Sequence, residues 1–252
     1  MKLVHRTAVA LALVFAFTLS AKDARREMVV NLKFVPQESV QTTSPDLPQD
    51  LLDRGFELRL EDSRRLSDKA MIGEGTNDDD QTFPIRAGTD LIAYVNESLK
   101  GVSTAWALKD GRDRVLTIAV SRFFVNESNK PLGSMYSAEV KLSYVLTSAD
   151  GITLAKGIGS GEARRYGRSR SPDNCNEVLS DALKGAYAEV LGDTALHTAW
   201  ISGKPAAGSA SSSAEPKETP EERLKKLEDL YKKGLITKEE YERKRAEILK
   251  EL

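Results

Sequence analysis

The sequence predicts an α+β protein with a mostly antiparallel sheet, two helices on one face of that sheet, and a tethered C-terminal hairpin of two helices. Three observations lead to this prediction. Residues 114–166 hold three strand-like segments in succession, and amphipathic helical segments occur before and after them. A Gly-, Ala- and Ser-rich stretch then separates all of this from a short, highly charged helical pattern.

Composition limits the classes to which this chain can belong. It has 252 residues, of which 40% are hydrophobic and 30% charged, enough for one globular domain and a smaller unit. The net charge of −1 argues against a nucleic-acid-binding protein, which would normally carry a basic surplus. Cys175 is the single cysteine, so an intrachain disulfide and CxxC metal or redox motifs are excluded. We expect no cofactor.

The N-terminus has the pattern of a secretory signal peptide. Lys2 and Arg6 precede an apolar run over residues 7–19, two small residues follow, and the run is short for a membrane span. We therefore expect residues 1–21 to be cleaved and the protein to be exported, periplasmic or secreted. The alternative is an uncleaved anchor, since the small-residue site is imperfect. No cysteine follows the run, so we expect no lipid-modified N-terminal cysteine.

The first part of the main domain alternates between strand and loop patterns. Residues 30–34 and 56–61 have the period of two that indicates strands, whereas residues 37–49 and 67–82 are polar and are expected to be loops. The acidic run Asn77–Asp80 could chelate calcium. It lacks the spacing of an EF-hand, so we favour a solvated loop.

Two segments have the periodicity of amphipathic helices. The first is capped by Thr89 and ended by Gly101, and the second begins at Ser171 and ends at Gly192. Both apolar stripes suit packing on one face of a sheet. Cys175 lies on the stripe of the second helix, so we interpret it as an inert core thiol rather than a nucleophile.

Between these helices lie three predicted strands, residues 115–125, 135–147 and 152–166. In the second strand apolar residues alternate with mostly polar ones, so an antiparallel meander has one apolar face to cover. Ser148 to Gly151 has the composition of a hairpin turn.

The third strand contains a glycine-rich stretch and then a basic run. Gly157–Gly161 begins like a dinucleotide-binding motif, but Glu162 stands where its last glycine should be and no helix follows directly. We favour a bent or bulged strand. The basic run could contact a phosphate or an anionic lipid head group, although a solvated loop is favoured because the protein as a whole is not basic. Its residues are Arg164, Arg165, Arg168 and Arg170.

Several features are spread along the main domain, residues 26–200. They are the strand end Leu58–Asp62, an Asp-x-Arg at Asp62 and Arg64, Ile72-Gly73, the turn at Asp150-Gly151 and the late Ala/Leu helix. This set resembles YajG-type and transport-auxiliary lipoproteins of the bacterial envelope. The family's usual lipid-anchored cysteine is missing, which leaves membrane contact open. Asp62 and Arg64 could mark a site, but we favour an ion pair at a strand end.

Residues 201–218 have the composition of a flexible linker, and residues 219–252 that of a helical hairpin. Capping boxes begin its helices at Thr219 and Thr237. The stretch from Leu227 to Glu242 closely resembles the SHOCT module, a short C-terminal domain of bacterial proteins. The resemblance implies oligomerisation or contact with another protein.

A hairpin of this size rarely folds alone without a metal, a disulfide or a partner. Its apolar stripes could pack on another copy of the chain, on the main domain or on a partner. We favour another copy or another envelope protein, because the long linker makes docking on the main domain unnecessary, and we favour either over a hairpin that closes only on itself. The predicted contact residues are Leu224, Leu227, Leu230, Tyr231, Leu235, Ile236, Tyr241, Ile248 and Leu249.

These features favour a non-enzymatic exported envelope protein that binds or braces another envelope component and uses its hairpin for assembly. The alternative is a small-ligand or lipid-binding accessory protein of an envelope transport system, which a cavity lined by Phe, Leu and Ile would support. Catalytic triads have few candidates, because His197 is the only histidine left after signal removal. A carboxylate-based hydrolase is the remaining enzymatic hypothesis.

Overall fold

The structure is a computed structural model. It describes residues 27–37, 44–77 and 79–206, and in the C-terminal segment residues 227, 228, 241, 242, 244, 245 and 248. The predicted signal peptide, the linker beyond Ala206 and most of the predicted hairpin lie outside the described residues.

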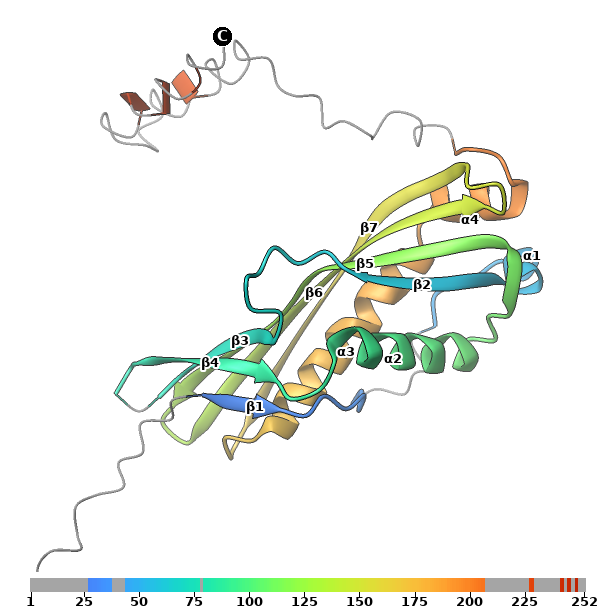
Figure 1. The fold of residues 1–252 in the computed structure, drawn as a ribbon. Helices are drawn as coiled ribbons and strands as arrows, with labels where there is room; N and C mark the ends of the chain where they lie inside the picture. Colours follow the sequence, from blue (N-terminus) through green and yellow to red (C-terminus); the bar gives the residue numbers. More distant parts are fainter. Residues whose placement is uncertain are drawn as a thin grey trace, which may run out of the picture.

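Within the described part of the chain, seven strands form one sheet and four helices pack against it (Figure 1). The α+β class is therefore confirmed. The strands are β1 (Met28–Val30), β2 (Phe56–Asp62), β3 (Met71–Thr76), β4 (Thr82–Ala87), β5 (Asp110–Lys130), β6 (Gly133–Ser148) and β7 (Thr153–Gly167). The helices are α1 (Gln49–Arg54), α2 (Leu91–Ala105), α3 (Pro172–Leu191) and α4 (Thr194–Ser202).

The sheet is mixed, so the prediction of a mostly antiparallel sheet is wrong. Its strand order is β1-β4-β3-β5-β6-β7, and β2 pairs with the first half of β5. The β3–β4 hairpin and the β5–β6–β7 meander are antiparallel, whereas β1–β4, β2–β5 and β3–β5 are parallel. The reason is that α2 forms a crossover between β4 and β5, which leaves β5 running in the same direction as β2 and β3.

β5 is the longest strand, and a bulge at Ser121 lets both of its halves face the core. The register with β6 shifts between Val120 and Arg122. Because side chains alternate between faces, one extra residue moves the inward positions from even to odd numbers. The inward, buried set is Leu116, Ile118, Val120, Phe123, Val125 and Glu127.

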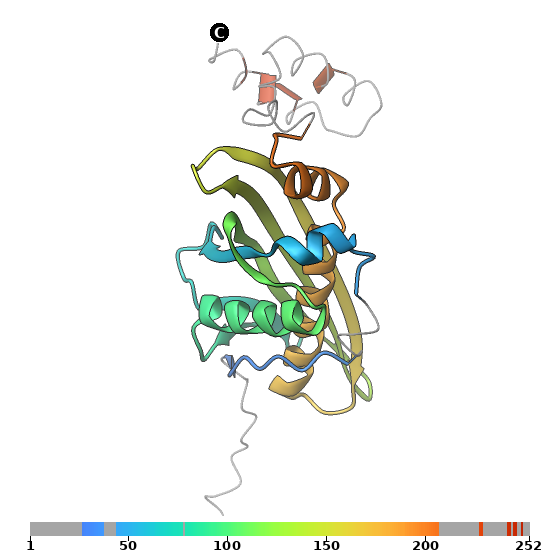
Figure 2. The same ribbon diagram turned by 90° about the vertical axis from the view of Figure 1, so that its right-hand side faces the viewer.

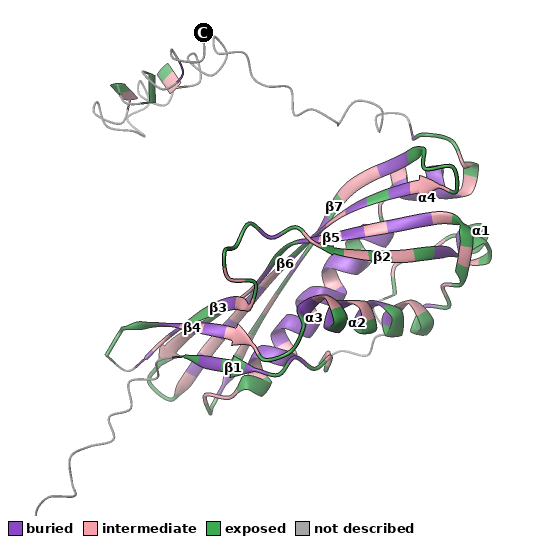
Figure 3. Cartoon of the chain, in the orientation of Figure 1, coloured by how far each residue is buried: buried purple, intermediate pink, exposed green. Residues whose placement is uncertain are grey.

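The two long helices, α2 and α3, lie on one face of the sheet, as predicted (Figure 2). Both helices and the strands carry buried residues, coloured purple in Figure 3, and these residues form one apolar cluster. Two hydroxyl pairs join the helices: Tyr94 Oη and Ser180 Oγ lie 3.3 Å apart, and Ser103 Oγ and Tyr187 Oη lie 2.7 Å apart. The core is therefore one layer of apolar side chains between the sheet and a connected helical layer.

The helix α4 and the segment after it close one end of the domain. Trp200 of α4 is fully buried, and its ring meets the ring of Phe56 edge-on, with centroids 4.6 Å apart. Ala206 N donates to Leu154 O at 2.9 Å. The folded chain thus continues to Ala206.

Helix boundaries follow the predicted signals at α3 but not at α2. Ser171 caps α3 as predicted. Asp90, not Thr89, is the N-cap of α2. The same helix continues through Gly101, because the next residue, Val102, is fully buried and its packing outweighs the low helix propensity of glycine.

Residues 31–37 form an extended segment whose backbone is held by α3 instead of by a strand. The predicted strand over residues 30–34 therefore stops at Val30. Side chains on one face of α3 accept the amide hydrogens of alternate residues. These bonds run from Lys33 N to Asn176 Oδ1 (3.1 Å), from Val35 N to Ser180 Oγ (3.0 Å) and from Gln37 N to Asp181 Oδ1 (2.9 Å).

The expected loop over residues 67–82 instead contains β3 and the start of β4. Two glycines weaken the strand signal there. A Cβ at Gly73 would lie 2.1 Å from Val125 O, and a Cβ at Gly75 would lie 2.2 Å from the ring of Phe83. These close approaches require glycine, which is otherwise depleted in strands.

The glycine-rich stretch of β7 is not bulged, so a bulge, one of the two favoured interpretations of Gly157–Gly161, is wrong. Its register with β6 is unbroken there. Gly159 and Gly161 instead face α3. A Cβ at Gly161 would lie 2.0 Å from Ala182 O, and one at Gly159 would lie 2.4 Å from Ala186 O. Close packing of α3 on β7 is the reason for these glycines.

The substitution Gly161→Ala should lower the free energy of unfolding by on the order of 2–3 kcal/mol, because the new methyl group has to push α3 away from β7. Gly185→Ala is the matched control, since its Cβ would meet only Gly161 Cα at 3.7 Å. That helical substitution should be neutral or stabilise by up to about 1 kcal/mol. Urea unfolding measures both, and equal effects would contradict the close-packing explanation.

Candidate functional site

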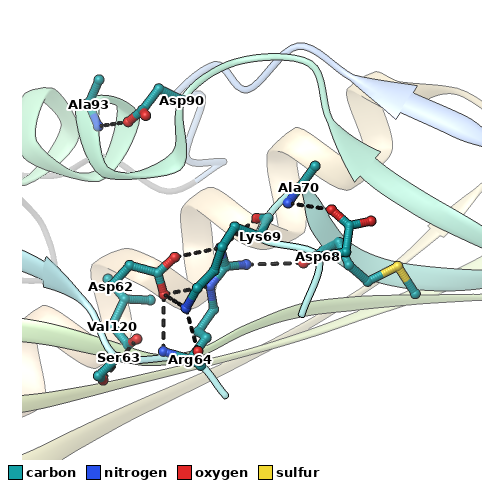
Figure 4. Close-up of polar contacts among 10 residues, drawn as sticks. Asp62, Ser63, Arg64, Asp68, Lys69, Ala70, Asp90, Ala93 and Val120 are labelled. Carbon is teal, nitrogen blue, oxygen red and sulfur yellow. Dashed lines mark hydrogen bonds and ion pairs between the residues drawn. The ribbon is translucent and has the colours of Figure 1, made fainter. Parts of the chain in front are cut away.

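The Asp-x-Arg motif forms a closed cluster after the end of β2 (Figure 4). Arg64 is only 4% exposed. Its Nε donates to Asp62 Oδ1 at 3.0 Å and its Nη2 to Asp62 Oδ2 at 2.9 Å. The same guanidinium donates to the carbonyl oxygens of Lys69 and Met71 at 2.7 and 3.0 Å. This cluster is the predicted ion pair at a strand end. It joins the two ends of the β2–β3 connection through hydrogen bonds of one guanidinium group.

The charge of Arg64 also changes the acidity of its partner. Hydrogen bonding by Arg64 is the main cause that holds the pKa of Asp62 below its ordinary value, and Lys69 adds a smaller attraction. Lys69 Nζ lies 3.5 Å from Asp62 Oδ1. The carboxylate is therefore charged and fully engaged with groups of its own chain at neutral pH.

The four arginines of the basic run do not converge on one point. Arg164 and Arg168 are exposed. Arg165 forms an ion pair with Glu177 of α3 at 2.5 Å, and Arg170 Nε lies 3.8 Å from a buried carboxylate. Two of the four are thus engaged within the domain, and contact of this run with an anion stays a prediction.

That buried carboxylate belongs to Glu127, which is 0% exposed near the end of β5. Its Oε1 accepts hydrogen bonds from Ser134 Oγ at 2.9 Å and from Tyr136 Oη at 3.1 Å. Its Oε2 is buried without a hydrogen-bond partner among the described residues. Burial of a carboxylate costs several kcal/mol, so these donors and the nearby Arg170 have to offset a large penalty.

Glu127 and burial together keep neighbouring groups protonated. Burial, with a smaller contribution from the charge of Glu127, raises the pKa of Tyr136 and the pKa of the Cys175 thiol each to about 12. A thiol with so high a pKa is a poor nucleophile. This fits the interpretation of Cys175 as an inert core residue, whose Sγ lies 3.9 Å from Met28 Sδ.

The remaining predicted chemical groups are also used by the fold. The ring of His197 is half-buried, and its Nε2 contacts the carbonyl oxygen of Leu191. In the acidic turn, Asn77 Oδ1 accepts from Asp79 N at 3.0 Å and from Gln81 N at 2.8 Å. Across the described residues, no group of three His, Cys, Asp or Glu side chains is placed to hold a metal ion.

A groove of about 590 Å³ lies between the C-terminal half of α2, strand β2 and the start of β5. Phe56, Leu58 and Leu108 supply its apolar lining. Its polar lining includes three cations, two carboxylates and two hydroxyls, from Lys100, Lys109, Arg112, Glu57, Asp110, Ser103 and Thr104. The volume is within the range of small-molecule sites.

The charges of this groove are not equally available. Lys109 Nζ is held by Asp53 at 2.9 Å, and Glu57 is held by Arg59 at 2.8 Å. Lys100 and Arg112 form no ion pair among the described residues. The groove therefore offers two available cations beside an apolar surface.

Neither Glu127 nor the groove is predicted by the sequence patterns described above. A signal for Glu127 exists: it follows Phe123 and Val125 at intervals of two, which places it on the inward face. The groove has no comparable signal, because it forms where residues 56–58 meet the distant stretch from Lys100 to Arg112.

Little of the predicted hairpin is described. Of the nine predicted contact residues, Leu227 and Tyr241 are half-buried, Ile248 is 6% exposed, and the other six lie outside the described residues. The predicted contacts of the hairpin stay a prediction. No helix in the described residues is long and apolar enough to cross a membrane.

The substitution Asp62→Asn should lower the free energy of unfolding at neutral pH by on the order of 2 kcal/mol, because Arg64 stays buried but loses its charged partner. The folded-state pKa of Asp62 is lowered, so its charge contributes to the free energy of unfolding. This contribution is fully present at a pH above the ordinary aspartate pKa of about 3.9, and it is lost as the pH falls through the folded-state pKa. The deficit of the variant should shrink as the pH of urea unfolding is lowered from about 5 to about 2.

Asp113→Asn is the control for this pH series, because Asp113 is exposed and its carboxylate has no ion pair among the described residues. It should leave stability unchanged at every pH. A deficit of Asp62→Asn that persists at the lowest pH would show that charge is not the basis of the contact.

Three solved structures are similar to parts of this chain. Protein XCC0632 from Xanthomonas campestris, of family DUF330, is 15% identical, with a TM-score of 0.44 over 68% of this chain and 95% of that one. A protein of Caulobacter crescentus CB15 proposed to be a lipoprotein is 17% identical, with a TM-score of 0.29 over 44% and 82%. Lipoprotein GNA1162 from Neisseria meningitidis is 12% identical, with a TM-score of 0.18 over 48% and 90%.

Two of these three are described as lipoproteins, the class that residues 26–200 resemble in sequence. With TM-scores below 0.5, none of them transfers a function to this chain. No curated protein matches the chain at a significant level. A family model matches residues 222–249, and its description is SHOCT, Short C-terminal domain. The predicted C-terminal SHOCT module is thereby confirmed.

Proposed function

We propose that this protein is a non-enzymatic exported envelope adaptor. Its α+β domain binds or braces one envelope component, and its SHOCT hairpin associates with another copy of the chain or with a partner. The observation that carries this proposal is the separation of two units: the bond from Ala206 to Leu154 closes the domain, and the SHOCT match begins at residue 222. The residues between have a linker composition.

The chemistry of the described domain supports binding over catalysis. The Cys175 thiol is buried and protonated, the His197 ring contacts a backbone carbonyl, and the buried carboxylate of Glu127 accepts from neighbouring hydroxyls. A catalytic group has to reach substrate, and these three are held by the fold. The exported, envelope location rests on the signal-peptide pattern and on the sequence resemblance to envelope lipoproteins.

Replacing Leu227 and Ile248 together by Asp should lower the mass in solution of the full chain from Lys22, because charge on the apolar stripe opposes hairpin association. Light scattering after size exclusion measures this mass. Arg245→Asp is the control: Arg245 is exposed, and the change alters net charge by the same amount. Equal masses for all three chains, in the presence and absence of envelope extract, would exclude the hairpin as an assembly module.

A second candidate function is the binding of a small amphiphilic anion, favoured by the groove beside α2. Lys100 and Arg112 could hold an anionic head group, while Phe56, Leu58 and Leu108 receive an apolar chain. This accounts for a cationic rim next to an apolar lining in one groove of about 590 Å³.

Laurate tests the second candidate, with binding measured by isothermal titration calorimetry on the full chain. Lys100→Glu and Arg112→Glu should each weaken laurate binding by about tenfold, the effect of one lost charge-assisted contact. Lys130→Glu, an exposed site at the far end of β5, should leave it unchanged. Absence of binding to the unmodified chain, or equal loss in all three variants, would remove this function.

A further inference from the structure

β7 forms one border of the sheet and pairs only with β6 (Figure 1). In an antiparallel pair, the N–H and C=O of one residue both point toward the partner strand or both point away from it. Ser160 N donates to Glu189 Oε2 of α3, so it points away from β6. The carbonyl oxygen of its register partner, Lys141, accepts a hydrogen bond from Ser121 Oγ of β5. The backbone groups of Lys141 therefore point toward β5 and away from β7, which agrees with this orientation.

The even-numbered residues of β7 therefore present their backbone groups at the border. Glu189 covers Ser160, but the outward groups of the other even residues from 156 to 166 have no hydrogen-bond partner among the described residues. An uncovered strand edge of this length is a template for another strand. Two of its side chains are large, apolar and exposed: Ile158 is 68% exposed and Tyr166 is 45% exposed.

The charges along this edge alternate in sign. Glu162 and Arg164 are both exposed, and neither forms an ion pair among the described residues. They are successive residues on the same face of β7. When two copies of this strand pair in antiparallel orientation, Glu162 of each copy can therefore lie opposite Arg164 of the other.

We propose that the border of β7 binds the same border of a second copy of this chain, antiparallel and centred on Ala163. In this register Glu162 lies opposite the partner's Arg164, and Arg164 lies opposite the partner's Glu162. Both pairs lie on the outer face of the sheet, away from α3. The resulting two-fold interface joins two sheets into one continuous sheet.

Charge selects this register over its neighbours. A slide by one hydrogen-bonding step in either direction places Glu162 opposite Glu162, or Arg164 opposite Arg164. Like charges directly opposite one another destabilise a strand pair, whereas opposite charges stabilise it. The amide of Ser160 leaves Glu189 in this arrangement and donates to the partner's backbone instead. An unrelated apolar strand would leave Glu162 and Arg164 without partners of opposite charge, so the edge is specific for a complementary strand.

The interface lies on the α+β domain and is independent of the SHOCT hairpin. It is therefore tested in full-length chains that carry Leu227→Asp and Ile248→Asp, so that hairpin association does not contribute. In this background the protein should be a dimer by sedimentation equilibrium. Glu162→Arg alone and Arg164→Glu alone should each weaken the dimer by at least about tenfold, because each variant places like charges opposite one another twice.

Mixing provides the decisive control. An equimolar mixture of the two single variants should regain the dimer, because the two arginines of one chain then face the two glutamates of the other. A chain that carries both Glu162→Arg and Arg164→Glu should also regain it, because the arginine introduced at position 162 faces the glutamate introduced at position 164 of its copy. A monomeric background, single variants that stay dimeric, or a mixture that stays dissociated would each overturn the proposed interface.

Discussion

The domain depends on one constraint: β5 has to pair with three other strands while its apolar side stays on the core. Its first half pairs with β2, its second half with β3, and its whole length with β6. A regular strand of this length would twist its far end away from the helices. The bulge at Ser121 restores the inward face, so that Leu116 and Val125 both reach the same core although their numbers differ in parity.

This solution also places a charge inside the protein. After the bulge the inward positions are odd, and the third of them is Glu127. The carboxylate is tolerated because Ser134 and Tyr136 of the neighbouring strand donate to it and Arg170 lies near it. The polar cluster thereby joins the β5–β6 hairpin to the segment that begins α3. The ion pair of Asp62 and Arg64 likewise joins β2 to the start of β3, because the buried Arg64 guanidinium also donates to the carbonyl oxygen of Met71.

Sequence patterns predicted the elements whose signal is local and missed those set by distant contacts. The alternation of β6 and the cap and stripe of α3 depend on neighbours in the chain, and both elements lie where they were expected. The direction of β2 and β3 depends on the crossover through α2, which no local pattern contains. The glycines at 73, 75, 159 and 161 look like breaks in a strand, yet each marks a place where another element comes too close for a Cβ. The groove beside α2 likewise depends on a distant contact, because residues 56–58 meet the stretch from Lys100 to Arg112.

The close packing of α3 on β7 links the interior of the domain to its surface. Because Gly159 and Gly161 carry no side chains on the inner face, α3 lies close to the strand, and Glu189 on that helix reaches over the border to Ser160. Glu189 covers only that amide, and the neighbouring outward groups stay unpaired among the described residues. Arg64 and Glu127, both buried, already have partners within the fold, so the proposed recognition uses surfaces of this kind. The edge of β7 and the groove beside α2 share no residues, so the proposed contact with a second copy and the proposed binding of a ligand do not compete for the same side chains.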